Sequence, residues 1–143
     1  MSRASLIRSV RFSAGHHYWK PDWSAEKNRA HFGPSVHRHG HNFRVEVVVE
    51  GPVDPDTGFV VDLAQLDALL KGEVVEPLDQ RDLTEAVPDF RPGAALPTTE
   101  NLARWIWDRL EGRVPGTAVL ERVRVFESED LGAEYRGPGE VRK

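Results

Sequence analysis

The chain has no cysteine among its 143 residues, which excludes disulfide bonds, thiolate metal ligands and thiol catalysis. It has no apolar run near the ~20 residues that a membrane-spanning helix needs, and its first residues lack the apolar stretch of a signal peptide. Basic charge is not in excess, because 19 Lys and Arg stand against 23 Asp and Glu, a net charge of −4. That sign argues against general nucleic-acid binding, which depends on neutralising phosphates. We therefore expect a cytoplasmic protein with neither a nucleic-acid nor a membrane partner.

The chain is long enough for one folded domain over residues 1–143, and its hydrophobic content of 39% is ordinary for a globular protein. Alternating apolar residues predict strands over 5–14 and 39–50. Shorter apolar runs predict strands over 59–61, 119–127 and 133–136.

Two segments have helical spacing. Asp62 is a predicted helix cap before apolar residues that extend to Val74, and Thr98 or Thr99 caps a second helix that closes at Gly112. The order of elements predicts an α+β fold, an antiparallel sheet with two helices packed on one face. Two long stretches, 15–38 and 77–97, are predicted to be mainly loop. The other face and the two open edges of such a sheet favour oligomerisation.

All six histidines lie between His16 and His41. His39 and His41 are two residues apart, so on an extended chain their side chains share one face, with Cα atoms about 6.6 Å apart. His37 lies about 13 Å from His41 on such a chain, too far to join the same metal ion. A third ligand would come from the end of the first strand, at His16 or His17. Three imidazoles leave a fourth zinc position open, as in catalytic sites; the alternative is that these are ordinary surface histidines.

Several short motifs occur in order along nearly the whole chain. They are Phe-Ser-Ala-x-His (12–16), His-Gly-His-Asn (39–42), Asp-Pro-x-Thr-Gly (54–58), Pro-Leu-Asp (77–79), Pro-Thr-Thr-Glu-Asn (97–101) and Val-Phe-Glu (125–127). Together they resemble the 6-pyruvoyltetrahydropterin synthase family, which includes the 6-carboxytetrahydropterin synthases of queuosine biosynthesis. The resemblance implies the tunnelling fold, in which protomers join their sheets into a barrel, commonly a hexamer of two trimers. It also implies a zinc-dependent lyase that acts on 7,8-dihydroneopterin triphosphate or a related pterin.

The resemblance also implies roles for individual residues. The three zinc ligands would be His16, His39 and His41. Glu127 matches the carboxylate that binds the pterin ring, a task suited to a charged acceptor facing adjacent N–H donors. Thr98, Thr99 and Glu100 match the segment that completes the ring pocket; the alternative is that these residues simply start a helix.

The chain departs from the family where protons are moved. The family uses a cysteine thiolate to remove a proton and an Asp-His pair to relay protons, while zinc acts as a Lewis acid. Here Ser35 stands at the cysteine position of the shorter members, and the Leu-Asp-His motif ends in Gln80, so that only Asp79 remains. His37 is the best substitute base because an unperturbed imidazole titrates near pH 6.5. His31 and His17 are the other candidates.

Three interpretations remain open. The protein is a pterin lyase with substitute bases, an enzyme that cleaves the pterin side chain by a retro-aldol route, or a zinc- and pterin-binding oligomer without turnover. No residue is assigned to the phosphate tail, because surface bases such as Lys27, Arg29, Arg38 and Arg81 are commonly just solvated.

Overall fold

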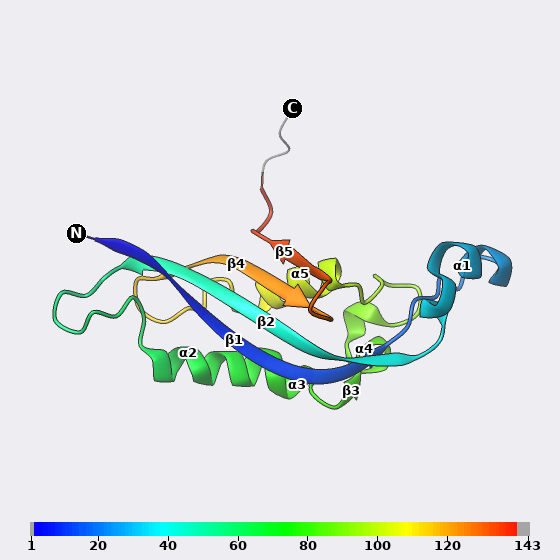
Figure 1. Ribbon diagram of the computed structural model, residues 1–143, viewed down its shortest axis with the longest axis horizontal. Coiled ribbons are helices and arrows are strands. Elements are labelled where there is room, and N and C mark those ends of the chain that lie inside the picture. The colour runs from blue at the N-terminus through cyan, green and yellow to red at the C-terminus, as the bar shows by residue number, and fades with distance from the viewer. Residues whose placement is uncertain (1, 140–143) are drawn as a thin grey trace.

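The computed structural model describes residues 2–139, which form a five-stranded sheet in the order β3-β1-β2-β4-β5 (Figure 1). The strands are β1 (Arg3–His16), β2 (His39–Pro52), β3 (Arg81–Asp82), β4 (Val119–Phe126) and β5 (Gly132–Tyr135). All neighbouring pairs are antiparallel except β3, which pairs in parallel with β1 at two positions. The predicted α+β class is confirmed, with this short parallel strand as an addition.

The centre of the sheet is the long β1–β2 pair. Its register runs without a break from Arg3 opposite Pro52 to His16 opposite His39. Phe12 and Phe43 stack across the pair with ring centroids 5.1 Å apart, on the face that the helices cover. Because side chains alternate between faces, this register decides which side chains of the two strands meet at the histidine end.

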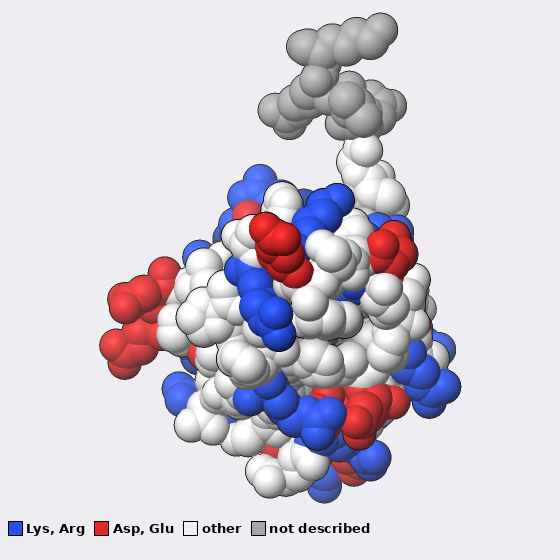
Figure 2. Space-filling view, turned by 90° about the vertical axis from the view of Figure 1, so that its right-hand side faces the viewer, with Lys and Arg blue, Asp and Glu red and all other residues white. Residues whose placement is uncertain are grey.

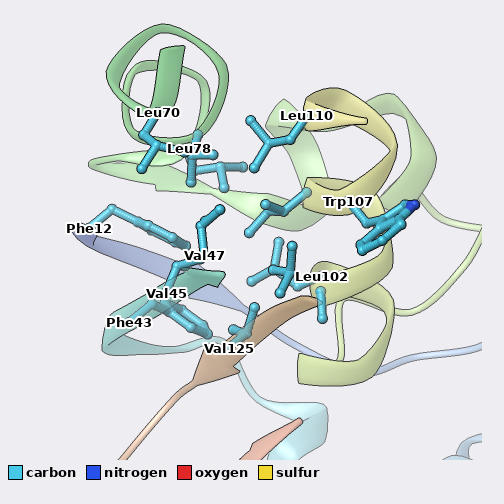
Figure 3. Close-up of a cluster of buried hydrophobic side chains, with 14 of the residues drawn as sticks. Phe12, Phe43, Val45, Val47, Leu70, Leu78, Leu102, Trp107, Leu110 and Val125 are labelled. Carbon is cyan, nitrogen blue, oxygen red and sulfur yellow. The ribbon is translucent and has the colours of Figure 1, made fainter. Parts of the chain in front are cut away.

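Helices cover one face of the sheet, as predicted. Helix α2 (Leu63–Leu70) continues through wider turns at Lys71–Val75 into α3 (Glu76–Leu78), and α5 (Thr99–Leu110) lies beside them. Asp62 caps α2 and Thr98 caps α5, each side chain accepting a backbone N–H three residues on. Leucines of these helices, including Leu70, Leu102 and Leu110, fill the core against the strands (Figure 3).

The prediction of a strand at residues 59–61 is wrong. The segment is an irregular connection between β2 and α2. Both edges of β2 are already paired, one with β1 and the other with β4, so the returning chain finds no free edge beside it. Val61 is nevertheless buried and packs into the core, which explains why the segment is apolar.

The segment predicted as loop over 15–38 holds more regular structure than expected. Strand β1 continues to His16, and helix α1 (Ala25–Phe32) and a 3-10 turn (Gly33–Val36) follow. Asn28 is fully buried and bonds the backbone of Lys20, Trp23 and Ser24, which folds the loop on itself. Helix α1 has no apolar stripe for a sequence pattern to reveal. It projects from one end of the molecule, where Lys and Arg side chains form a band (Figures 1 and 2).

The segment predicted as loop over 77–97 is only partly loop. It contains β3, a four-residue helix α4 (Leu83–Ala86) and a 3-10 turn at Pro88–Phe90. Pro77 does not begin the loop, because it lies within α3, the last helical turn after α2. Each of these pieces is too short to produce a periodic apolar pattern, so the sequence shows mainly the prolines.

The sheet keeps an open edge and an open face. Strand β3 pairs with β1 only at Ala14 and Gly15, so the rest of the outer edge of β1 has no neighbouring strand among the described residues. On the face away from the helices, the side chain of Ile7 is 58% exposed. Within residues 2–139 no helix has the length and apolar character to cross a membrane.

Candidate metal and substrate site

Three histidines meet at one end of the sheet. His16 ends β1, while His39 and His41 begin β2, and all three side chains lie on the helix-covered face because His16 is paired with His39 and Ala14 with His41. One ring nitrogen from each imidazole lies within 4.8 Å of the other two. Of the two alternatives left by the sequence, His16 and His17, the structure brings His16 to the pair.

Backbone carbonyls orient two of these rings. Nδ1 of His16 donates to the carbonyl of Pro97, and Nδ1 of His39 donates to the carbonyl of His37, each at 2.8 Å. A carbonyl only accepts, so the proton is on Nδ1 and the lone pair on Nε2 is free for a metal ion. Nε2 of His16 and of His41 are buried with no hydrogen-bond partner. These orphaned nitrogen atoms are the donor set that a divalent transition metal such as zinc prefers.

Burial keeps His16 in the form that binds metal. The side chain is fully buried, and this desolvation, with a smaller contribution from the other two imidazoles, lowers the pKa of His16 to about 4. The bond to Pro97 opposes the shift without cancelling it. The ring is therefore neutral at physiological pH, and a metal ion would not have to displace a proton from it.

Glu127 directly follows β4 and reaches the same cluster. Its Oε2 lies 3.6 Å from Nε2 of His41 and 3.9 Å from Nε2 of His16. Its side chain is only 14% exposed, and Oε2 has no hydrogen-bond partner in the described chain. A buried acceptor without a donor is costly. This carboxylate is thus available to N–H donors of a bound molecule.

Tyr18 is a site residue that the sequence argument missed. Its ring packs edge-on to His16, with centroids 5.1 Å apart, and lies 6.4 Å from the ring of His39. Burial, followed by the negative charges of Glu127 and Glu100, raises the pKa of Tyr18 well above its usual value. The phenol is therefore a neutral hydrogen-bond donor beside the carboxylates. Its position two residues after His16, hence on the same side of an extended chain, was the available signal.

The start of α5 contributes to the site mainly through its backbone. The carbonyl of Pro97 holds His16, the hydroxyl of Thr98 caps the helix by accepting from Asn101 N at 3.1 Å, and Thr99 is buried. Glu100 is exposed, but its charge acts on Tyr18. The segment Pro97–Glu100 therefore lies beside the histidine cluster. The capping hydrogen bond is enough to explain a threonine at position 98, with no need for a ligand contact.

The predicted proton-transfer residues around Ser35 lie at the edge of the site. The Ser35 carbonyl accepts from Tyr18 N at 2.8 Å, so its 3-10 turn is tied to the ring that packs on His16. The side chain of His37 is exposed, and His37 contacts the cluster through its backbone carbonyl, which accepts from Nδ1 of His39. The structure brings neither side chain into the histidine triad itself.

Asp79 and Gln80 hold the end of β1. Asp79 Oδ1 accepts from Ser13 N at 2.9 Å, and Gln80 N donates to the Ser13 carbonyl at 2.7 Å. Gln80 has a φ of 60°, a conformation that non-glycine residues adopt at a cost. The Gln80 side chain is exposed and lines a hollow whose lining also includes His41 of the triad.

Comparison with known families supplies independent information. A family model described as 6-pyruvoyl tetrahydropterin synthase matches residues 5–138. The human 6-pyruvoyl tetrahydrobiopterin synthase is 37% identical over 137 residues, which cover 94% of this chain and 92% of the human protein. A dihydroneopterin monophosphate aldolase from Pyrococcus furiosus is 33% identical over 132 residues, 92% of this chain and 96% of that protein.

A solved structure gives the same result at the level of fold. The 6-pyruvoyl tetrahydropterin synthase of Caenorhabditis elegans superposes with a TM-score of 0.87 at 30% identity, covering 96% of this chain and 98% of that one. The match spans both the sheet and the covering helices, so the histidine end of the sheet lies within the shared architecture.

Proposed function

Because this chain belongs to the 6-pyruvoyl tetrahydropterin synthase family, we propose that it is a zinc-dependent lyase acting on 7,8-dihydroneopterin triphosphate or a closely related pterin phosphate. The observation that carries the proposal is the convergence of three imidazoles on one point, with the free carboxylate oxygen of Glu127 beside them. That pairing of a three-nitrogen metal site with a buried acceptor suits a ligand bearing both oxygens and N–H donors.

Each side chain has a task in this proposal. His16, His39 and His41 would hold the ion, which when bound supplies Lewis-acid polarisation of the side-chain oxygens. Glu127 accepts hydrogen bonds from the pyrimidine part of the pterin, and Tyr18 donates from its neutral phenol. The rings of Tyr18 and Phe43 pack against the imidazoles and limit water at the cluster.

The residues available for proton transfer differ from those of the family at two positions, Ser35 and Gln80. Ser35 and His37 come from the turn just before β2, and Asp79 comes from the segment that clamps β1. A serine hydroxyl needs a neighbouring base to act at neutral pH, and glutamine does not titrate. We therefore assign base chemistry to His37, and Ser35 and Asp79 are the other candidate proton-transfer residues.

One incubation tests the function directly. Zinc-loaded protein is mixed with 7,8-dihydroneopterin triphosphate, and the products are identified by mass. Loss of triphosphate with the three-carbon side chain still attached to the pterin supports the lyase. Recovery of intact substrate after prolonged incubation with stoichiometrically loaded protein overturns it and leaves a binding protein.

The second candidate function is retro-aldol cleavage of the pterin side chain. The similarity to the Pyrococcus furiosus aldolase favours it, as does the replacement of the family cysteine and relay histidine by Ser35 and Gln80. This reaction breaks a carbon–carbon bond and releases a two-carbon aldehyde that carries the phosphate. The same mass analysis distinguishes the two, because the pterin product keeps one side-chain carbon rather than three.

Restoring the family residues tests the substitute bases. We expect the double variant Ser35→Cys, Gln80→His to increase formation of the three-carbon product at least tenfold, since a positioned acid or base contributes roughly 10²–10⁴-fold. Histidine tolerates the backbone of Gln80 because it is among the residues enriched at positive φ. Product ratios by mass measure the effect. A double variant slower than the wild type in this reaction would show that the native residues already form the working set.

The family resemblance and the open sheet also support assembly into a hexamer of two trimers. The unpaired outer edge of β1 offers free backbone groups, and the exposed Ile7 lies on the uncovered face beside it. Sedimentation velocity measures the assembly. A particle with the mass of one 16.1 kDa chain at micromolar concentration would contradict it.

A further inference from the structure

A second pocket begins at Glu127 and continues around the end of β4 to the other face of the sheet. Strand β2 extends past β4, because their pairing starts only at Arg44 opposite Phe126. The notch left beside the start of β2 is a pocket of about 480 Å³, a volume typical of small-molecule sites. Its lining includes His41 and Glu127 from the candidate site and two arginines, Arg11 and Arg44.

The two arginines face each other across the β1–β2 pair. Arg11 and Arg44 are direct partners in the register, and like charges in directly opposed positions destabilise a sheet. Arg44 is held in place by an ion pair with Glu46 and by stacking over the ring of Phe126, 4.3 Å from its centroid. Within residues 2–139, Arg11 has no carboxylate partner at ion-pair distance. Arg11 is thus a charge that the described chain does not neutralise, and it is suited to an external anion.

The carboxylates near this pair do not cancel its charge. Glu46 is shared between Arg44 and Arg124, which lies 3.0 Å away. Glu129 also lines the pocket, but its side chain is exposed and screened by water. The pocket therefore has a buried carboxylate, Glu127, at one end and a surplus of guanidinium groups at the other.

We propose that Arg11 and Arg44 bind the phosphate tail of the substrate while Glu127 binds its pterin ring. This inference rests on the proposed function, which supplies a ligand with N–H donors at one end and phosphates at the other. Guanidinium groups match phosphate oxygens in a bidentate geometry. Arg38, another base at this end of the sheet, is already paired with Asp82 and Glu85.

Anion binding tests the arginines without any need for turnover. Zinc-loaded wild type and Arg11→Gln are titrated with inorganic tripolyphosphate by calorimetry, and we expect Arg11→Gln to bind about tenfold more weakly because a charge-assisted contact is lost. The matched control is Arg3→Gln, which removes the same charge from the same face at the other end of β1, where Arg3 pairs with Glu50. Wild type and both variants all carry the metal, so any binding of the anion to the metal cancels when their dissociation constants are compared.

Turnover, where present, adds a second readout. Arg11→Gln should raise KM for the phosphorylated pterin about tenfold while leaving KM for unphosphorylated dihydroneopterin unchanged. Equal tripolyphosphate affinity in Arg11→Gln and wild type overturns the proposal, as does an equal loss in Arg3→Gln. If neither pterin is turned over but the anion still prefers wild type, the proposed function fails and the anion site stands.

Discussion

Replacing His39 by alanine should abolish metal binding and reduce turnover by roughly 10³-fold or more, the size expected when Lewis-acid stabilisation of several kcal/mol is lost. His39 supplies one of three nitrogens that lie within 4.8 Å of one another, and two imidazoles cannot hold an ion as three do. Metal content after dialysis and initial rates on the pterin phosphate measure the two effects. Zinc should fall from one ion per chain to a small fraction.

The matched control is His31→Ala. His31 is an exposed histidine of α1 that packs against Trp23, away from the triad. This variant should keep its zinc. Full zinc content in His39→Ala would mean that the ion is bound elsewhere, and the assignment of the triad would have to be abandoned.

Glu127→Gln should lower kcat/KM about 10²-fold, mainly through a higher KM, and should leave the zinc content unchanged. The change replaces a charged acceptor by a neutral amide of nearly the same shape, so the loss reports on charge-assisted bonds to the pterin. Steady-state rates and metal analysis on the same preparation provide both values.

The zinc content of Glu127→Gln distinguishes a carboxylate that binds the pterin from one that binds the metal. Glu127 Oε2 lies 3.6 Å from Nε2 of His41, close enough for the carboxylate to be a fourth metal ligand instead. If Glu127→Gln loses zinc along with activity, that alternative is correct. Asp130→Asn removes an exposed carboxylate three residues further along the chain that does not line the pocket, and it controls for a general change in charge.

Much of the fold could be predicted because it rests on local patterns. The alternation of Phe43, Val45 and Val47 matches the buried face of β2, and the caps Asp62 and Thr98 begin helices where expected. Strong periodicity and short-range capping are properties of neighbouring residues, so they can be read directly from the chain. The predicted strand at 59–61 failed for the converse reason, since its pairing depended on an edge that β4 had already occupied.

The loop regions were harder to predict because buried polar contacts hold them. Helix α1 is organised by one asparagine, Asn28, whose partners are backbone groups up to eight residues away. Tyr18 belongs to the site only because the chain after β1 turns back over the histidines. Neither contact produces a repeating pattern in the sequence.

The amino-acid sequence by itself determined the alternating strands, the helix caps, the spacing of His39 and His41, and the loss of the cysteine and relay histidine. Residue spacing left His16 and His17 open, and the family resemblance pointed to His16 and Glu127. Only the tertiary structure shows that these two side chains reach the pair of His39 and His41, and that Arg11 faces Arg44. The physical reason is that these three contacts join residues from different strands. Their meeting depends on strand register and on the path of the connecting loops, which local residue preferences do not specify.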